Sequence, residues 1–412
     1  MKKILYSLTS DLHAELTAPS SVDPFIRDIE SCMACNFEYR GEDFSNYGKN
    51  PDDEEYIFVR SGGTEGKFLR KFASSGTLSV PGGKPVKIIT SGQSNSLAAS
   101  MEIISYLNRN GYPGKILHGT PSAIVSQMAD CHPAVRRITG TLNLGIRLGV
   151  VGHPSDWLIS SDVDYAKAAE VLGVELVDVP MEELISEMEK GGYEVPEGFD
   201  INLGTPLFAK AFKQDDREVA LKIYGALCRI VEKYGLSGFT LRCFDLLTAV
   251  RNTGCLALAI FNSRGIPACC EGDVPALLSM VLADKVAGTP GFQANLSRIS
   301  GDRYLFAHCT VPFNIVKSYC FDTHFESGMG VAVHGEFKPG PATIFKIGAA
   351  LDSFMAEDAV IESNQYENNL CRTQIFVKAA ALDGYFLANS LGNHHIIIPG
   401  LHAEELKNLL QK

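Results

Sequence analysis

The sequence lacks long apolar segments and runs of basic residues. Its best apolar stretch, residues 255–261, is far shorter than the roughly 20 residues that a helix needs to cross a bilayer. Acidic residues exceed basic ones, 48 against 37, and the formal net charge is -11. No basic run offers the positive field that a phosphate backbone requires. We therefore expect neither a membrane nor a nucleic-acid partner.

The N-terminal residues also lack the uninterrupted apolar core of a signal peptide. Ser7, Thr9 and Ser10 follow too soon after the first apolar residues. We therefore expect residues 4–8 to form a first β-strand and the protein to be cytoplasmic.

The cysteines do not have the pattern of a disulfide framework. Their number, 11, is odd, and five of them fall in apolar strand or helix patterns, which predicts reduced, buried thiols at Cys243, Cys255, Cys269, Cys270 and Cys309. Cys32 and Cys35 have zinc or redox spacing, but no second such pair follows. That pair is a weak candidate for a metal or redox site.

The chain is long enough for two or three domains, and its pattern predicts an α/β protein. Short apolar runs, among them predicted strands over 56–59, 86–90 and 239–244, alternate with helical patterns up to about residue 288, with a break near residue 146. The clearest helical pattern begins after Asp216 and ends at Gly235. The β-rich remainder has predicted strands separated by turn clusters, over 304–311, 330–337, 342–347, 374–377 and 395–398. We therefore predict an N-terminal α/β domain over 1–145, a second α/β domain over 146–288 and a β-rich domain over 289–412. A loop over 191–204 is expected to arch over the second sheet.

Two glycine- or serine-rich turns resemble known motifs without matching them. Residues 61–67 have three residues between the glycines, whereas a phosphate-binding loop has four. The functional hypothesis that remains for this turn is a contact with a sugar or a carboxylate. Residues 91–96 lie where a nucleophile elbow would, but Ser96 replaces the glycine that its sharp turn requires. Helix capping is the expected role of these hydroxyl groups.

The carboxylates with the best position for chemistry are Glu271 and Asp273. Glu271 directly follows an apolar strand, and the carboxyl ends of parallel strands are where open α/β folds bind ligands. Asp273 precedes a helix that starts with Val274 and Pro275, so it is a candidate both for chemistry and for an N-cap.

Histidines are concentrated in the β-rich part. His308 follows an apolar strand, where a core role and a functional role are both open. His394 and His395 are adjacent on a predicted strand, so their rings must point to opposite faces and only one can enter a given site.

Four segments together resemble the L-fucose and L-arabinose isomerase superfamily, and particularly its shorter fucose-isomerase-like members: residues 239–247, 265–273, 306–309 and 392–395. The resemblance covers most of the chain and is strongest after residue 149. It implies two Rossmann-like parallel-sheet α/β domains followed by a β-rich C-terminal domain. It also implies a divalent cation, usually Mn²⁺, held where the second and third domains meet, and a homo-oligomer in which one N-terminal domain covers the neighbour's site.

The resemblance implies a metal-ligand set as well. Glu271 matches the first metal-binding glutamate, and His394 or His395 matches the C-terminal histidine. Asn295 occupies the place of the second carboxylate. An amide can offer a carbonyl oxygen to a metal, but it carries no charge and cannot act as a base near neutral pH. Glu271, alone or with Asp273 or His308, would then have to move protons, and His308 is also a candidate polar contact of the substrate.

The expected function is a metal-dependent aldose–ketose isomerase that acts on a pentose or deoxyhexose, such as L-fucose or D-arabinose, through an enediol. Arg242, Ser94 and Trp157 are the candidate substrate contacts. The main alternative is a noncatalytic sugar- or polyol-binding protein on the same fold, because Asn295 replaces a carboxylate. A weaker alternative is a metal-assisted reaction on a sugar acid or a phosphorylated sugar.

Overall fold

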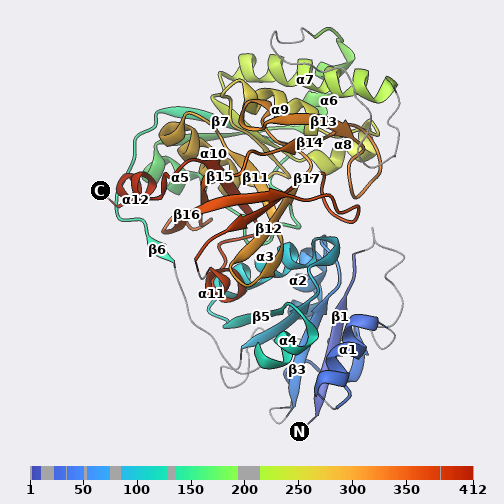
Figure 1. Ribbon diagram of the computed structural model, residues 1–412. Coiled ribbons are helices and arrows are strands. Elements are labelled where there is room, and N and C mark those ends of the chain that lie inside the picture. The colour runs from blue at the N-terminus through green and yellow to red at the C-terminus, as the bar shows by residue number, and fades with distance from the viewer. Residues whose placement is uncertain are drawn as a thin grey trace.

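The computed structural model describes residues 2–10, 23–33, 35–50, 53–74, 85–127, 135–193, 214–380 and 382–411. Figure 1 shows the N-terminal part as a separate layered body below the rest of the molecule, with helices α2 (Glu65–Ser74) and α3 (Ser96–Arg109) at the junction. Most of the predicted loop over 191–204 lies outside the described residues.

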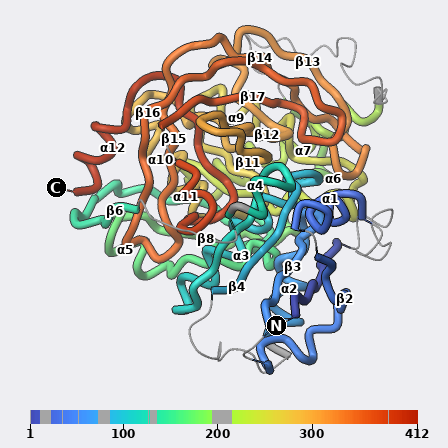
Figure 2. The backbone as a smooth tube through the Cα atoms, turned by 60° about the horizontal axis from the view of Figure 1, so that its bottom comes forward, coloured from blue at the N-terminus to red at the C-terminus, as the bar shows by residue number. Residues whose placement is uncertain are grey.

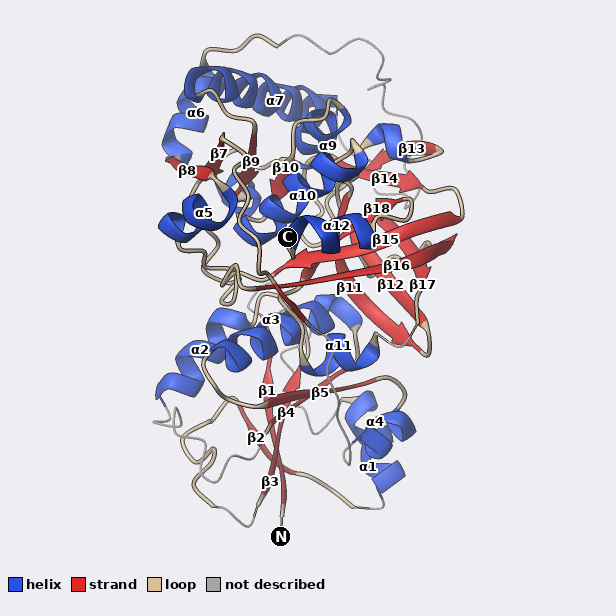
Figure 3. Ribbon diagram, turned by 90° about the vertical axis from the view of Figure 1, so that its left-hand side faces the viewer, coloured by secondary structure: helices blue, strands red, loops and turns tan. Residues whose placement is uncertain are grey.

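The N-terminal part is built on a five-stranded parallel sheet in the order β2-β1-β3-β4-β5. Its strands are β1 (Lys3–Leu8), β2 (Glu38–Gly41), β3 (Glu54–Val59), β4 (Val86–Thr90) and β5 (Gly114–His118). Along β1, Ile4 and Tyr6 pack into one apolar cluster with α2 and α3, while Leu5 packs into another. This alternation follows from the two-residue period of a strand, and it lets α1 (Pro24–Met33) and α4 (Pro121–Gln127) cover the opposite face (Figure 3).

The second α/β part has a four-stranded parallel sheet in the order β10-β9-β7-β8. Its strands are β7 (Ile146–Val151), β8 (Val174–Val179), β9 (Gly238–Leu241) and β10 (Ala268–Cys270), and its helices are α5 (Tyr165–Leu172), α6 (Met181–Glu189), α7 (Gln214–Tyr234), α8 (Cys243–Ala249), α9 (Cys255–Ser263) and α10 (Val274–Ala287). The prediction of a strand over 239–244 was too long. The strand ends at Leu241, and α8 begins two residues later.

The C-terminal part is a closed antiparallel barrel. Six strands follow the order β15-β18-β11-β12-β17-β16, and β16 closes the barrel by pairing with β15. They are β11 (Phe292–Ser300), β12 (Arg303–His308), β15 (Gly340–Ile347), β16 (Ser353–Asn364), β17 (Thr373–Lys378) and β18 (His394–Pro399). In Figure 2 the strands β16 and β17 lie in the upper part of the view, and β2 lies at the lower right, at the opposite end of the molecule. The predicted order of two parallel-sheet parts and a β-rich part is confirmed.

Several smaller elements complete the fold. A hairpin of β13 (Ser318–Asp322) and β14 (Ala332–Glu336) lies beside the barrel, with η5 (Phe313–Ile315) before it and α11 (Asp383–Ala388) and α12 (Ala403–Leu410) after it. The short β6 (Arg136–Arg137) pairs with β16, so the chain contacts the barrel before it enters β7. The predicted boundary near residue 146 therefore falls after this contact.

The turn before α3 joins the N-terminal part to the barrel. It contains η4 (Gln93–Asn95) and Gly92, whose φ is +79°. A Cβ on Gly92 would lie 2.5 Å from the backbone oxygen of Ser297 on β11, so only glycine allows this close approach. No hydroxyl caps α3, because its N-cap is Asn95, which makes no side-chain capping bond. The Ser91 hydroxyl does accept from the backbone nitrogen of Gln93, the first residue of η4, at 3.3 Å.

The structure also tests two of the expected absences. No helix in the described ranges is long and apolar enough to cross a membrane. The five cysteines predicted as buried thiols are all free and buried, which confirms that prediction. Cys32 and Cys35 are also free, and Cys32 is exposed.

Candidate active site

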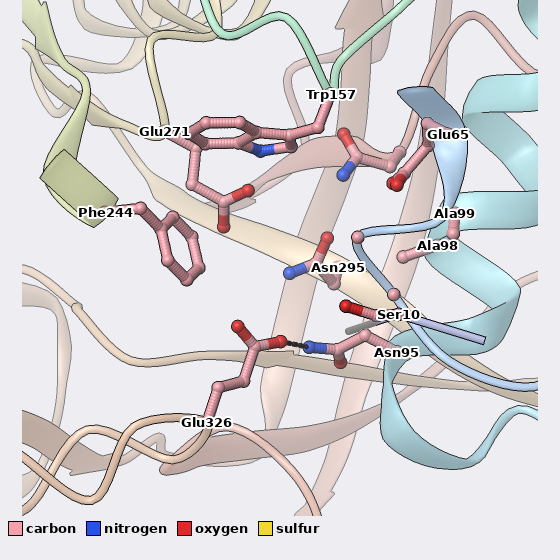
Figure 4. Close-up of a pocket in the computed structure, with 13 residues that line it drawn as sticks. Ser10, Glu65, Asn95, Ala98, Ala99, Trp157, Phe244, Glu271, Asn295 and Glu326 are labelled. Atoms are coloured by element: carbon pink, nitrogen blue, oxygen red, sulfur yellow. Dashed lines mark hydrogen bonds between the residues drawn. The ribbon is translucent and has the colours of Figure 1, made fainter. Parts of the chain in front are cut away.

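A cavity of about 300 Å³ lies where the three parts of the chain meet. Figure 4 shows side chains that enter it from the second domain, the barrel and the N-terminal part. Its lining residues are Ser10, Gly62, Gly63, Glu65, Asn95, Ala98, Ala99, Trp157, Phe244, Glu271, Asn295, Glu326 and Asn393. The resemblance implied that a neighbour's N-terminal domain would cover the site, but here the chain's own N-terminal part forms this wall.

Glu271 enters the cavity from a tight turn after β10. Its φ is +64°, which is unusual for a residue with a side chain, and the following Gly272 has φ +63°. A Cβ on Gly272 would lie 2.9 Å from the backbone nitrogen of Ser155, and the Ser155 hydroxyl donates to the carbonyl of Glu271. This packing holds Glu271 in a strained conformation, which is a common feature of functional positions.

Two histidines of the barrel lie beside the Glu271 carboxylate. Oε1 of Glu271 is 3.6 Å from Nε2 of His308 and 3.4 Å from Nε2 of His394. His308 ends β12 and His394 begins β18, and both rings are buried. One candidate ligand atom from each of the three residues lies within 4.8 Å of the others. His308, predicted as a catalytic group or substrate contact, thus lies among the possible metal ligands.

Asp273 lies behind this group and fixes the orientation of His394. One carboxylate oxygen caps α10 by accepting from the backbone nitrogen of Ala276 at 2.7 Å. The other lies 2.9 Å from Nδ1 of His394 and 3.5 Å from Nζ of Lys346. The Asp273 side chain is fully buried, so it is placed to orient a ligand rather than to touch a substrate. Of the two roles predicted for it, the N-cap is observed.

The charges of these groups depend on one another. Burial alone would raise the pKa of Glu271, but the positive charge of His394 and the hydrogen bond from His308 outweigh it and lower that pKa. Burial opposes protonation of His394, yet Glu271 and Asp273 raise its pKa to about 9. Burial lowers the pKa of His308. Glu271 is therefore held ionised, which suits a metal ligand better than a base.

Asn295 faces the same cavity from β11. In the sheet it pairs directly with His394, so the two residues lie side by side at the barrel rim. Oδ1 of Asn295 has no hydrogen-bond partner among the described residues. The amide oxygen is therefore free to meet a ligand, as the sequence suggested, although it supplies no charge.

His395 lies outside the group. Its Nε2 is 2.8 Å from the hydroxyl of Tyr385, and its Nδ1 is 3.2 Å from the carbonyl of Asn393. Burial lowers its pKa to about 3. The alternation of a strand sends this ring into the barrel interior, and of the two adjacent histidines it is His394 that reaches Glu271.

The three side chains fit a divalent cation. Nδ1 of His394 is committed to Asp273, and its buried Nε2 has no hydrogen-bond partner within the described ranges. An imidazole that is held at one nitrogen by a carboxylate and open at the other is the usual arrangement of a metal-binding histidine. Two imidazole nitrogens and a carboxylate oxygen suit several divalent transition metals, Mn²⁺ included.

An aromatic pair forms another wall of the cavity. The ring of Trp157 meets the ring of Phe244 edge to face, with 5.4 Å between centroids. The Arg242 guanidinium lies 4.8 Å above the Trp157 ring and forms ion pairs with Asp156 and Asp245. Trp157 therefore lines the cavity, and its contact with a substrate stays a prediction. Arg242 supports it from outside the lining, and Ser94 does not line the cavity although its neighbour Asn95 does.

Sequence reasoning missed two acidic residues of this cavity, Glu65 and Glu326. Glu65 begins α2 in the glycine-rich turn, is 3% exposed, and its Oε2 has no partner in the part of the chain that the structure describes. Glu326 lies between β13 and β14 and accepts a hydrogen bond from Nδ2 of Asn95 at 2.8 Å. The turn at 61–67 was a usable signal for Glu65, but no local pattern marks Glu326.

Comparisons with known proteins give limited support. No protein-family model matches the sequence. A sulfoquinovose isomerase from Clostridium sp. (strain MSTE9) is 26% identical over 151 residues. These residues are 33% of this chain and 32% of the relative, so the chain spans about a third of that protein's length. The similarity supports a sugar-isomerase kind of protein and specifies neither a substrate nor a metal.

Proposed function

We propose that this chain is a metal-dependent aldose–ketose isomerase. The observation that carries the proposal is the group of Glu271, His308 and His394, whose possible ligand atoms lie within 4.8 Å of one another beside the cavity. A divalent cation bound there would polarise a sugar carbonyl and so acidify the adjacent C–H bond. Aldose–ketose isomerisation requires this acidification, because it proceeds by moving a proton between C2 and C1 through an enediol.

The residues of the chain would divide the remaining work. Glu271, His308 and His394 hold the cation, while Asp273 fixes the ring of His394. The rings of Trp157 and Phe244 offer an apolar face to the C–H bonds of a sugar, and the amides of Asn95, Asn295 and Asn393 can bond its hydroxyl groups. Closure of the cavity by the N-terminal part limits the access of water to the reacting atoms.

The lining favours a neutral sugar. It contains three glutamates and, among the described residues, no lysine or arginine. A sulfonate or phosphate would need cationic or oriented N–H partners to offset its desolvation. We therefore propose a neutral pentose or deoxyhexose, such as L-fucose or D-arabinose, as the substrate. A sulfonated sugar, which the name of the relative would suggest, is the less favoured substrate.

Proton exchange monitored by NMR tests the proposed reaction. The protein is incubated in D2O with Mn²⁺ and with L-fucose, D-arabinose, L-arabinose or sulfoquinovose in separate samples, and the metal is removed before acquisition. We expect ketose formation and deuterium at C2 for at least one neutral sugar. Conversion of sulfoquinovose alone would contradict the substrate class, and no exchange with any sugar would contradict the reaction.

Asn295 supports a second candidate function, a noncatalytic sugar- or polyol-binding protein. The amide keeps a hydrogen-bonding group at the cavity but contributes neither charge nor a proton acceptor. This candidate predicts sugar binding by calorimetry without any C2 exchange. It also predicts that Asn295→Asp, which restores a carboxylate, would bring measurable exchange.

A further inference from the structure

The proposed reaction needs a base that takes a proton from carbon, and three of the candidate site residues are poorly suited to that role. Glu271 lies in the group that would hold the cation, so its carboxylate is not free to accept a proton from carbon. Asn295 is an amide and accepts no proton near neutral pH. Asp273 is fully buried behind His394 and does not line the cavity. A base must therefore come from another part of the wall.

Glu326 is placed for that role. It lines the cavity from the segment between β13 and β14, and Asn95 of the N-terminal part fixes one of its carboxylate oxygens at 2.8 Å. Figure 4 shows Glu271 and Glu326 entering the cavity from opposite sides, with Asn295 to one side of the space between them. A sugar held at Glu271 would therefore present its opposite face toward Glu326.

The surroundings of Glu326 also make it a stronger base than Glu271. Burial and the negative charge of Glu271 raise the pKa of Glu326 to about 7, although the hydrogen bond from Asn95 lowers it. The other titratable groups that interact with this carboxylate are Glu65 and the thiol of Cys371. A carboxylate that titrates near neutrality combines basicity with a substantial ionised fraction, which is the optimum for general base catalysis.

We propose, on the basis of the function proposed above, that Glu326 is the general base that carries the proton between C2 and C1 of the open-chain sugar. Its carboxylate takes the proton from C2, and the electrons of the broken C–H bond form the C1=C2 double bond. The C1 carbonyl oxygen gains a proton from solvent, which gives the enediol. Glu326 then returns its proton to C1, while the C2 hydroxyl loses its proton to solvent and becomes the ketose carbonyl.

Glu65 is the competing acid of the same wall. It is almost fully buried in the first turn of α2, and burial raises its pKa to about 8. The Glu326 carboxylate is held in the cavity by Asn95, whereas Oε2 of Glu65 has no hydrogen-bond partner among the described residues. Glu326 is therefore the acid with a fixed orientation across the cavity from Glu271, and Glu65 is better suited to bonding a sugar hydroxyl.

The test compares Glu326→Gln with Glu65→Gln and with the control Glu182→Gln, an exposed glutamate in the first turn of α6. Each protein is assayed with the first sugar that the wild-type chain converts. Mn²⁺ binding by electron paramagnetic resonance and sugar binding by calorimetry show whether the variant is folded and loaded. We expect Glu326→Gln to keep both binding activities and to lose about 10²- to 10⁴-fold in kcat, with C2 deuterium exchange reduced equally.

The pH profile separates a base from a structural contact. With saturating Mn²⁺, the wild-type kcat should fall as the pH drops and the Glu326 carboxylate gains a proton. Because the cation offsets the negative charge of Glu271, this acid limb should lie below the pKa of about 7 that Glu326 has without a metal. Glu326→Asp, which keeps a carboxylate, should retain partial activity and a shifted limb. An acid limb that persists unchanged in Glu326→Gln would show that Glu326 serves only as a structural contact of Asn95. Metal occupancy is measured across the same pH range, so that loss of Mn²⁺ is recognised.

The outcomes distinguish this inference from the proposed function. Wild-type conversion together with full activity of Glu326→Gln would overturn the role of Glu326 and leave the isomerase proposal standing. Loss of exchange in Glu65→Gln but not in Glu326→Gln would assign the base to Glu65 and would likewise overturn it. Absence of conversion by the wild-type protein with any aldose would overturn both proposals together.

Discussion

Glutamates on two sides of one cavity have pKa values that are shifted in opposite directions. On the metal wall, which we define as Glu271, His308 and His394, the two imidazole rings offset burial and lower the pKa of the glutamate. On the acid wall, defined as Glu65, Asn95 and Glu326, burial raises the pKa of Glu65 to about 8 and that of Glu326 to about 7. The same side chain is thus suited to hold a cation on one side and a proton on the other.

The difference arises from the neighbours that each part of the fold supplies. The metal wall is formed by β10, β12 and β18, whose ends bring histidines and the buried Asp273 next to Glu271. The acid wall is formed by the starts of α2 and α3 and by the hairpin segment. Within the described ranges, Glu326 has a side-chain hydrogen bond with Asn95 alone. A buried carboxylate without a cation nearby favours its protonated form.

Removing the charge of Glu271 should have the largest effect on metal binding and turnover, because it alters the metal wall itself. Glu271→Gln leaves the shape of the side chain but takes away the anionic ligand, so we expect Mn²⁺ binding to be lost and turnover to fall on the order of 10³-fold. Spin-resonance titration with Mn²⁺ and the NMR assay measure the two effects. Wild-type activity in this variant would show that the metal wall has been assigned incorrectly.

A smaller loss is expected when the support of His394 is weakened. Asp273→Asn keeps a good N-cap for α10 but removes the charge that holds Nδ1 of His394. We expect about 10- to 100-fold weaker Mn²⁺ binding. The thermal unfolding temperature should also fall, because the buried ammonium of Lys346 loses the charge 3.5 Å from it. Unchanged metal affinity would mean that His394 needs no orientation by this carboxylate.

Stability as a function of pH examines the acid wall directly. Burial raises the pKa of Glu65 from 4.5 to about 8, so the folded protein keeps a proton there that the unfolded chain releases. The contribution of this proton to the unfolding free energy is fully present below about pH 4.5 and is lost as the pH rises toward 8. In metal-free protein, Glu65→Gln should flatten the fall of the unfolding free energy over this range, as measured by urea denaturation. Glu182→Gln is the matched control, and parallel curves for all three proteins would refute the expectation.

The aromatic wall should contribute the smallest of these effects. Trp157→Leu removes the flat surface beside Phe244 while keeping an apolar side chain. An aromatic contact of this kind is worth about 1 kcal/mol, which corresponds to roughly fivefold weaker sugar binding. Calorimetry with the converted sugar measures the change. An unaltered affinity would indicate that the sugar lies away from Trp157.

Local patterns in the sequence were sufficient for much of the fold. Alternating apolar runs identified β1, β3 and β4, and the amphipathic repeat located α7. The longest barrel strand, β16, was missed because the exposed Asp358 and Glu362 interrupt its apolar character, although Ala359 and Ile361 between them are buried. Period-two alternation is hard to recognise in a strand that also contains a register shift.

The candidate site was only partly predictable for a similar reason. Glu271 follows a strand, which places it at the edge of a sheet without any knowledge of tertiary structure. The choice between His394 and His395 requires the register of β18 with β11, which pairs His394 with Asn295. Glu326 lies 55 residues after Glu271 in a segment without regular structure, so only the folded chain brings the two carboxylates to one cavity.

The account depends most directly on which of two adjacent histidines binds a metal. Mn²⁺ binding should be titrated by electron paramagnetic resonance in the wild-type protein, His394→Gln and His395→Gln. We predict one tightly bound ion in the wild-type protein and in His395→Gln, and loss of that ion in His394→Gln, because only His394 reaches Glu271. Equal binding by the two variants, or tighter binding by His394→Gln, would contradict the proposed metal wall.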